Sequence, residues 1–253
     1  MQVITSKENE QIKQIRKLKD KKFRDEQGLY IIEGVKTINE AIEEDAKIET
    51  IVICDDCEKQ GTLDQKLLYE VAKYNLIYVN EKVFGYITEV MNPQGILAVV
   101  SKKEKKKINY NEDIIVVLDN IQDPGNLGTI IRTLDSAGIK QIILSKGTVD
   151  VYSSKVVRST MGAIFRINII ESENLKDTIK TMQKHEYEVM ATSLQGAKSI
   201  YDVKYKKVAI VIGNEAKGVS KEILELSNQN IKIPMIRKNR KSKCSGCNKY
   251  NCI

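Results

Sequence analysis

The chain is poor in the side chains from which metal centres and nucleophilic triads are most often built. It has no tryptophan and a single histidine, His185, which nearly excludes a histidine-based metal site or catalytic triad. Its five cysteines are an odd number in 253 residues and do not suggest a disulfide framework. No apolar run approaches the length that spans a bilayer, and the opening residues MQVITSKENE lack the apolar stretch of a signal peptide. We therefore expect a soluble, cytoplasmic protein with no membrane partner.

The composition leaves room for one large core or two modest ones, because 42% of the residues are hydrophobic. The 41 basic residues outnumber the 34 acidic ones and give a formal charge of +7. Such a surplus favours a polyanionic partner only where the cations are clustered. The net charge by itself therefore leaves the partner open.

Residues 1–105 show the pattern of a small α/β domain. Strands are expected at 29–34, 48–54 and 95–101, and helices at 35–44 and 67–74. A further helix, with Ser6 as a candidate N-cap, is expected before the first of these strands. The charged stretch SKKEKKKINYNED (101–113) then marks a domain boundary. Its lysines could contact RNA, but a solvated linker is the commoner meaning of such a run.

Residues 106–236 have the pattern of a parallel sheet with helical crossovers. Continuous apolar strands are expected at 114–119, 141–145, 187–193 and 208–213. Strands buried on both faces have this composition, and the helical patterns between them imply parallel pairing. Ligands bind such sheets in the loops beyond the carboxyl ends of the strands.

Two of these loops carry polar residues. In DNIQDPGNLGTIIRTLDSAG (119–138), the DPG tripeptide is expected to form a turn, and Asn126 to cap the helix that carries Arg132. In GNEAKGVS (213–220), Ser220 is expected to cap the next helix. Turn geometry alone could explain the glycines of both loops. Neither loop has the spacing G-x-G-x-x-G or G-x-x-x-x-G-K-[ST], which disfavours dinucleotide or P-loop binding.

These segments resemble the motifs of a known family. NIQDPGNLGTIIRTLDSAG is similar to the first signature motif of the SpoU (TrmH) family of RNA ribose 2′-O-methyltransferases, in the SPOUT superfamily. VAIVIGNEAKGVS resembles the second motif, IKIPMI the opening of the third, and KVVRSTMGAIFRI (155–167) a further stretch typical of the family. The N-terminal domain resembles the L7Ae-like substrate-binding domain that many members carry. The resemblance covers residues 1 to about 236.

The resemblance implies a fold, a reaction and a partner. It implies a SPOUT-type α/β knot methyltransferase domain, with a parallel sheet and a C-terminal trefoil knot that is an exception to the rule against knots. It implies transfer of a methyl group from S-adenosylmethionine to a ribose 2′-hydroxyl of RNA, by a homodimer that needs no metal. The N-terminal domain favours ribosomal RNA over transfer RNA as the substrate.

The resemblance also assigns site residues by their place in the motifs. The catalytic positions are Arg132, Asn126 and Glu215, and the cofactor contacts are Thr192, Gly213 and Ile233. A ribose hydroxyl is a poor nucleophile and needs proton removal or charge stabilisation as it attacks. Because arginine has a pKa above about 12, Arg132 is expected to hold a phosphate and stabilise the developing alkoxide instead of acting as a base. The alternative for Arg132 is an ordinary ion pair on the helix surface.

Residues 237–253 depart from the family. Members continue with glycine and a serine–leucine–asparagine core, whereas this chain continues with RKNRKSKCSGCNKYNCI. One interpretation is a basic arm that binds RNA. Another is a zinc site, because Cys244 and Cys247 form one CxxC motif and Cys54 and Cys57 form another. The two pairs, however, lie far apart in the sequence and in different predicted domains.

A shift of reading frame explains this tail better. Codons that encode Arg237 to Ile253 can be chosen so that reading begins one base later and gives GKTESLNVAVATNIIV, the expected third motif and the start of its helix. We hypothesise that the tail is this motif in the wrong frame, through a sequencing error or a real frameshift. The tail would then be irregular, the knot incomplete, and cofactor binding, dimerisation and activity weak.

The function expected from the sequence is 2′-O-methylation of ribosomal RNA. Two alternatives stay open: 2′-O-methylation of transfer RNA, and RNA binding without catalysis by a family member that has lost the third motif.

Overall fold

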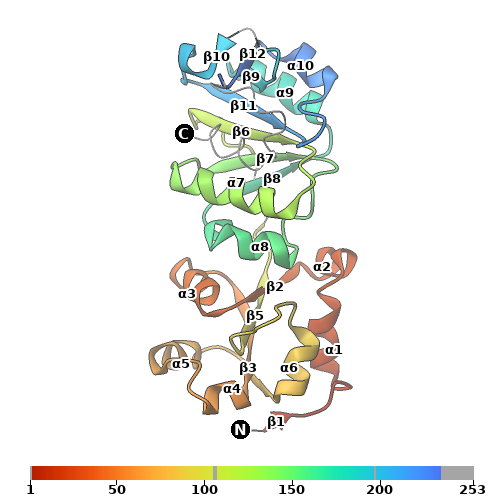
Figure 1. The fold of residues 1–253 in the computed structure, drawn as a ribbon, viewed down its shortest axis with the longest axis vertical. Helices are drawn as coiled ribbons and strands as arrows, with labels where there is room; N and C mark the ends of the chain where they lie inside the picture. The colour runs from red at the N-terminus through yellow and green to blue at the C-terminus, as the bar shows by residue number, and fades with distance from the viewer. Residues whose placement is uncertain (1, 105–106, 197, 235–253) are drawn as a thin grey trace. The chain divides into compact units, whose positions relative to one another are not determined.

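The computed structural model describes residues 2–104, 107–196 and 198–234, which divide into two compact units (Figure 1). The first unit comprises Met1–Glu104 with Tyr152–Phe165, and the second comprises Lys105–Val151 with Arg166–Ile253. The C-terminal tail, and with it the expected closing segment of the knot and all of the expected third motif beyond residue 234, lies outside the described residues. No helix in the described ranges is long and apolar enough to cross a bilayer.

The first unit is built on a mixed sheet with the strand order β1-β4-β3-β5-β2. Its strands are β1 (Val3–Ile4), β2 (Leu29–Glu33), β3 (Ile48–Cys54), β4 (Leu76–Val79) and β5 (Ile96–Ser101). Its helices are α1 (Glu10–Lys17), α2 (Lys21–Gln27), α3 (Val35–Glu43), α4 (Asp55–Lys59), α5 (Gln65–Val71), α6 (Glu81–Ile87) and α8 (Ser154–Thr160), with the short 3₁₀ turn η1 (Ala163–Phe165). Strand β5 runs antiparallel to both of its neighbours, whereas β1, β4 and β3 are parallel. The strands predicted at 29–34, 48–54 and 95–101 are confirmed to within one residue.

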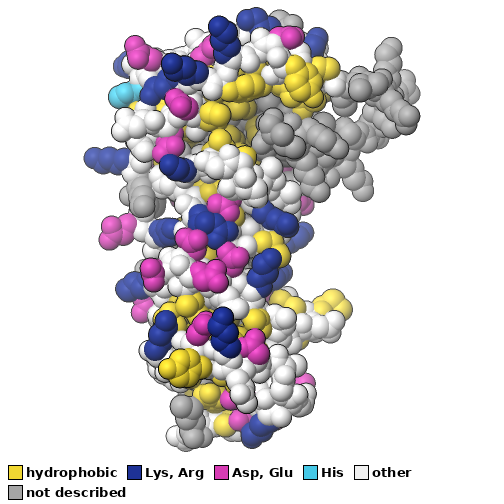
Figure 2. Space-filling model, turned by 90° about the vertical axis from the view of Figure 1, so that its left-hand side faces the viewer, with side chains coloured by type: hydrophobic (Ala, Val, Ile, Leu, Met, Phe, Trp, Pro, Cys, Tyr) yellow, Lys and Arg dark blue, Asp and Glu magenta, His cyan; other side chains and the backbone are white. Residues whose placement is uncertain are grey.

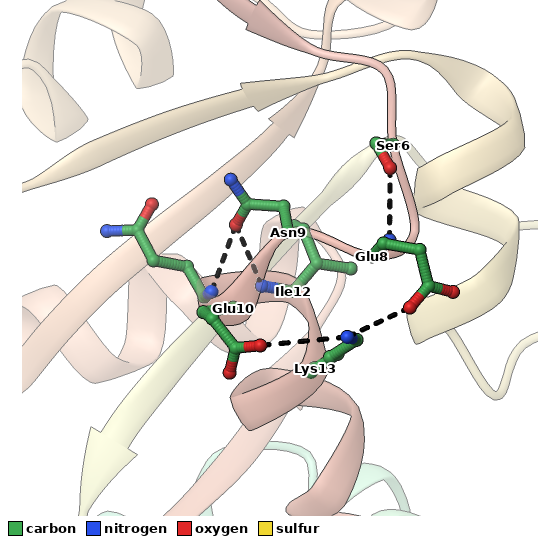
Figure 3. Close-up of polar contacts among 7 residues, drawn as sticks. Ser6, Glu8, Asn9, Glu10, Ile12 and Lys13 are labelled. Carbon is green, nitrogen blue, oxygen red and sulfur yellow. Dashed lines mark hydrogen bonds and ion pairs between the residues drawn. The ribbon is translucent and has the colours of Figure 1, made fainter.

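Helix α1 is capped by a different residue from the one predicted. Asn9 is the N-cap, and its side-chain oxygen accepts hydrogen bonds from the backbone N–H groups of Gln11 at 2.9 Å and Ile12 at 3.3 Å (Figure 3). Ser6 instead accepts from the N–H of Glu8 at 3.1 Å and closes the preceding turn. The prediction of Ser6 as the cap is wrong, because an asparagine stands directly before the first helical residue and caps as well as serine does.

The core of the first unit lies between helices α1 and α6 and the sheet, and the two helices run side by side in Figure 1. The buried side chains of this cluster include Ile12 and Ile15 of α1, Val83, Phe84 and Ile87 of α6, and Val52 and Leu97 of the sheet. Each fully buried aliphatic or aromatic side chain contributes roughly 2 kcal/mol of transfer free energy. At one end, Arg16 and Lys19 donate to the carbonyl oxygens of Tyr86 and Thr88 at 2.6 and 2.7 Å. These two cations therefore stabilise the fold itself.

The segment Tyr152–Phe165 packs on the first unit, although its sequence is typical of the catalytic domain. The ring of Tyr152 lies 4.8 Å from that of Tyr30 and 4.7 Å from the Lys102 ammonium nitrogen. Gly162 lies against Glu40, whose Cγ would be 2.7 Å from a Cβ added at this glycine. The chain thus enters the first unit a second time. A single boundary near residue 105, as predicted, does not include this second segment.

Glu33, at the end of β2, is half-buried within this unit. Burial raises the pKa of its carboxyl group, although a hydrogen bond from the Thr88 hydroxyl and the charges of Arg158 and Lys19 act in the opposite direction. This carboxyl group is therefore a source of pH-dependent stability.

The second unit is built on a sheet with the strand order β10-β12-β9-β11-β6-β7-β8, which the labels of Figure 1 follow. Its strands are β6 (Ile114–Asp119), β7 (Gln141–Ser145), β8 (Asn168–Ser172), β9 (Glu188–Thr192), β10 (Lys198–Ser199), β11 (Val208–Gly213) and β12 (Gln229–Lys232). Its helices are α7 (Pro124–Ser136), α9 (Leu175–Lys184) and α10 (Lys221–Leu226), with the 3₁₀ turn η2 (Ile200–Asp202). Every strand pair is parallel, which confirms the predicted parallel sheet.

The second core lies between this sheet and the helices α9 and α10. Its buried side chains include Ile115, Val117, Ile143, Val189, Ala209 and Val211 of the strands, and Ile179, Met182 and Ile223 of the helices. Burial on both faces explains why the central strands read as unbroken apolar runs. It also leaves the polar residues of the unit concentrated in the loops at the strand ends.

Candidate active site

The candidate site lies at the carboxyl edge of the parallel sheet, where β6 and β11 end side by side. Asp119 pairs with Gly213 at the last position of the two strands. Because the strands are parallel and in register, the loops that follow them leave the sheet at the same edge. These loops are the two segments that carry the first and second motifs.

Helix α7 starts at this edge and is capped by Asp123. The Asp123 carboxylate accepts a hydrogen bond from the backbone N–H of Asn126 at 2.7 Å, and Pro124 occupies the first helical turn. The predictions that the DPG tripeptide forms a separate turn and that Asn126 is the cap are wrong, because aspartate followed by proline already starts a helix. The side chain of Asn126 is therefore not engaged in capping.

Asn126 instead bonds to Glu215, in the loop after β11. Its side-chain amide donates to one Glu215 carboxylate oxygen at 3.1 Å, and the backbone N–H of Asp123 donates to the same oxygen at 3.3 Å. The N–H of Gln122 donates to the other oxygen at 3.4 Å. One half-buried carboxylate thus collects three donors from the start of α7, where the helix dipole also favours a negative charge.

The loop after β11 keeps its shape through Asn214, a residue that the sequence interpretation missed. Its buried side-chain oxygen accepts from the N–H groups of Ala216 and Lys217 at 2.9 and 3.0 Å. Its amide nitrogen donates to the carbonyl oxygen of Asn120 at 2.8 Å. Asn214 therefore ties the second-motif loop to the first-motif loop. The sequence signal that could have identified Asn214 is its position directly before Glu215 in the GNE tripeptide.

Asp119 makes a second connection that the sequence did not predict. Its buried carboxylate accepts from the N–H of Ser220 at 2.9 Å, so the last residue of β6 holds the start of α10. Gly213, beside it, allows this close approach. A Cβ added there would lie 2.0 Å from the Val219 nitrogen and 2.1 Å from the Gly218 carbonyl carbon. Backbone atoms cannot yield to such a clash, so this position requires glycine.

Arg132 lies two turns further along α7 than Asn126, with its side chain exposed. Within the described part of the chain, its guanidinium makes no hydrogen bond or ion pair. The structure thus brings Asn126 and Glu215 together but joins Arg132 to neither of them. An exposed guanidinium beside this edge can still receive an anionic group of a ligand.

The three predicted cofactor contacts lie at the ends of neighbouring strands. Thr192 is the last residue of β9 and is paired with Ile231 of β12. Gly213 is the last residue of β11, and Ile233 directly follows β12. The Thr192 hydroxyl donates to the carbonyl oxygen of Val211 at 3.0 Å, so it braces the adjacent strand. What these positions offer a ligand is mainly backbone N–H and C=O groups.

These backbone groups fit S-adenosylmethionine, the cofactor that the family resemblance implies. An adenine ring can be held by backbone donors and acceptors at strand ends, and the site needs no acidic cluster or metal ligands for that purpose. No group of three or more histidine, cysteine, aspartate or glutamate side chains within the described residues could hold a metal ion.

Charge does not mark a separate nucleic-acid surface on the face shown in Figure 2. There, lysine and arginine side chains are interleaved with aspartate and glutamate across the surface. The formal surplus of +7 is therefore not gathered into one basic block on this face.

Each of the two parts of the chain matches a known protein family. The SpoU rRNA Methylase family matches residues 113–242, and the MRM3-like substrate binding domain matches residues 9–98. The first match covers the parallel sheet and both loops of the candidate site. The second covers most of the first unit.

Individual relatives agree with these matches. The chain is 30% identical over 236 residues, 93% of its length and 91% of the other protein, to the 23S rRNA (guanosine(2553)-2′-O)-methyltransferase RlmP of Bacillus subtilis. It is 35% identical over 164 residues to the mitochondrial rRNA methyltransferase 3 of Xenopus tropicalis, covering 61% of this chain but 38% of that longer one. The crystal structure of an AdoMet-bound rRNA methyltransferase from Sinorhizobium meliloti superposes with a TM-score of 0.83 and 31% identity, over 99% of this chain and 95% of that one.

Proposed function

Because the chain belongs to the SpoU rRNA Methylase family, we propose that it is an RNA (ribose-2′-O-)-methyltransferase that uses S-adenosylmethionine and acts on ribosomal RNA. The observation that carries this proposal is the bond between Asn126 and Glu215, which joins the two motif loops at the carboxyl edge of the sheet. The similarity to RlmP and to the AdoMet-bound Sinorhizobium enzyme supports the substrate class and the cofactor.

The cofactor site is proposed at the ends of β9, β11 and β12. Thr192, Gly213 and Ile233 would hold S-adenosylmethionine, chiefly through backbone groups. When bound, this molecule supplies a methyl group on a positively charged sulfur. The absence of a side chain at Gly213 lets the end of β11 lie directly against the backbone of Gly218 and Val219 in the 213–220 loop.

The proposed catalytic roles follow from the chemistry of the three polar residues. Arg132 binds an RNA phosphate and stabilises the negative charge that develops on the ribose 2′-oxygen as its proton leaves. Glu215 holds Asn126 and the first turn of α7, which sets the position of the helix that carries Arg132. Asn126 is the third polar residue of this site, and its side-chain amide is held in place by the hydrogen bond to Glu215.

The first unit is proposed to bind the RNA substrate, and the second to carry the reaction. The match of residues 9–98 to an MRM3-like substrate binding domain supports this division. If it is correct, the full chain binds ribosomal RNA without the cofactor, and the affinity falls steeply with salt, as phosphate contacts require. A shift assay at increasing salt concentration measures this. Salt-independent binding, or none, would contradict the assignment.

Methyl transfer is tested directly with labelled S-adenosylmethionine and unmodified ribosomal RNA, followed by mapping of 2′-O-methyl positions. Label in ribosomal RNA supports the proposal, and label in transfer RNA alone supports the transfer RNA alternative. The non-catalytic alternative is supported if the chain binds RNA, transfers no label, and shows no binding of S-adenosylmethionine in calorimetry. That alternative is favoured by one observation, the departure of residues 237–253 from the third motif.

We further propose a homodimer located in the cytoplasm that needs no metal. The family resemblance supports the dimer, and light scattering of the purified chain tests it. Activity that survives a chelator and is not increased by added divalent metal would support metal-free catalysis.

A further inference from the structure

We propose that Cys54 and Cys57 form a reversible disulfide at the end of β3. The CDDC motif that contains them takes no part in the proposed methyl transfer, and the inference does not depend on that function. Cys54 is the last residue of β3 and directly precedes α4, and Cys57 lies in the first turn of that helix. Two cysteines placed at a helix cap and three residues later are at the spacing of redox-active CxxC motifs.

The fold places the two side chains over one small space. That space lies above Gly95, which precedes β5 and whose carbonyl oxygen accepts a hydrogen bond from the Cys54 N–H at 2.8 Å. A Cβ added at Gly95 would lie 2.4 Å from the Cβ and 2.9 Å from the sulfur of Cys57, and 3.4 Å from the Cβ of Cys54. Both cysteine Cβ atoms therefore border the same point beside Gly95, and a disulfide requires such neighbouring Cβ atoms. The absence of a side chain at Gly95 leaves the room that the Cys57 side chain occupies.

The surroundings of Cys54 favour a neutral thiol. Cys54 is fully buried and Cys57 is half-buried. Burial raises the pKa of the Cys54 thiol to about 11, and its hydrogen bond with the Cys57 side chain acts in the same direction. A disulfide is retained more readily when the thiol that its reduction would release is not stabilised as a thiolate, as at Cys54.

The neighbouring carboxylates are engaged elsewhere and do not turn the motif into a metal site. Asp55 pairs with the Lys59 ammonium at 2.6 Å, and Asp56 accepts from the N–H of Glu81 at 2.8 Å. No cluster of three metal-ligating side chains includes these cysteines among the residues that the structure describes. Two thiols with no further ligand are suited to forming a bond with each other.

The oxidant is a small-molecule disulfide, and the exchange takes two steps. The more exposed Cys57 sulfur attacks one sulfur of the oxidant, forms a mixed disulfide and releases one small thiol, which takes up the Cys57 proton. The Cys54 sulfur then attacks the Cys57 sulfur, forms the internal disulfide and releases the second small thiol with the second proton. Two protein thiols are oxidised while one small disulfide is reduced to two thiols. The new bond ties the first turn of α4 to the end of β3.

The test uses the full chain and oxidised glutathione as the probe. Trypsin releases Ile48–Lys59, IETIVICDDCEK, which contains both cysteines of the pair and no other. After exposure of the folded protein and rapid acid quenching, we expect this peptide to have lost two hydrogen atoms. The internal disulfide should exceed the glutathione adduct by at least about tenfold, and by more than in urea-unfolded chain, because the fold raises the effective concentration of the second thiol.

Variants separate the pair from the other cysteines. With Cys244, Cys247 and Cys252 all changed to serine, the same loss of two hydrogens is expected. With Cys54→Ala, Cys57 should accumulate the glutathione adduct instead. The proposal is overturned if the folded wild-type peptide stays reduced, if it carries only the adduct, or if urea increases the yield of the internal disulfide. The wild-type measurement decides the matter even where a variant fails to fold.

Discussion

The Glu215 carboxylate accepts a hydrogen bond from the Asn126 side-chain amide at 3.1 Å, although 89 positions separate the two residues in the chain. The contact exists because β6 and β11 are neighbours in the sheet and end at the same edge. It makes the start of α7 dependent on the loop that follows β11. The catalytic roles proposed for these residues therefore rest on a pair that can be tested as a unit.

A double-mutant cycle measures that pair. Asn126→Ala and Glu215→Ala should each destabilise the protein, and the double variant should lose less than the sum, with a coupling free energy of about 0.5 to 1.5 kcal/mol. Urea unfolding of the four proteins gives the free energies. The same cycle with Asn126 and the distant, exposed Lys180 should show no coupling. Additive losses for Asn126 and Glu215 would mean that the bond does not hold the loops.

Restoring the expected reading frame of the tail, with the rest of the chain unchanged, should increase cofactor binding and dimerisation. Replacement of the tail after Ile236 by GKTESLNVAVATNIIV and its natural continuation should strengthen S-adenosylmethionine binding and dimerisation. Calorimetry and light scattering measure the two effects, and sequencing the 3′ end of the gene tests the frameshift itself. An unbroken frame through Ile253, together with full activity of the 253-residue chain, would refute the hypothesis.

Arg132→Ala, made in a chain with the expected third motif, should abolish methyl transfer and leave cofactor affinity nearly unchanged. The exposed side chain makes no bond within the described residues, so the free energy of unfolding should change by less than about 0.5 kcal/mol. Loss of turnover would then report on chemistry and not on folding. Lys180→Ala, an exposed cation on α9 of the same unit, is the matched control and should retain activity. A variant of Arg132 that keeps most of its turnover would exclude the proposed role.

Gly213→Ala should destabilise the second unit by about 3 kcal/mol, the upper end of the usual cost of overpacking, because the new Cβ would meet backbone atoms at 2.0 and 2.1 Å. Cofactor binding should be lost with the shape of the 213–220 loop. Gly138→Ala is the control: its φ of +75° makes alanine strained by about 1–2 kcal/mol, but nothing lies within 4 Å of the added atom. Thermal unfolding and calorimetry of both variants test the difference. Equal losses would show that close packing at Gly213 has no special importance.

Glu33→Gln should make stability less dependent on pH. Burial raises the pKa of Glu33 above its ordinary value of 4.5, so its favourable contribution is complete below that value and is lost as pH rises through the folded-state pKa. The variant should match the wild type in acid and gain on it as pH increases, in urea titrations from about pH 4 to about pH 8.

Glu49→Gln supplies the opposite control in the same unit. A hydrogen bond from the Ser101 hydroxyl lowers the pKa of Glu49, so its contribution is present above 4.5 and is lost as pH falls through the folded-state pKa. This variant should therefore fall behind the wild type as pH rises. The same pH trend in both variants would contradict the assignment of the two shifts.

The strands at the centre of each sheet could be predicted from the sequence because their signal is local. β3, β6, β7 and β11 are short runs of β-branched and aliphatic residues, and their predicted bounds agree with the structure. β8 and β12 were not predicted, since NIIES and QNIK contain few apolar residues. Such strands form only because a neighbouring strand supplies hydrogen-bond partners, which is information that a single segment does not contain.

The two α/β units, the parallel sheet and the loops that carry the polar motifs could be predicted from local patterns, because hydrophobic periodicity and turn residues act over a few positions. The Asp123 cap of α7 is also local, since it spans three residues, but it was predicted at the wrong residue. The partner of the Asn126 side chain, Glu215, depends instead on the tertiary structure. It alone showed Asp119 and Asn214 bracing the two loops, and Tyr152–Phe165 packing with the first unit. These contacts join residues far apart in the chain, and which partner each polar group takes depends on how the strands are ordered in the sheet.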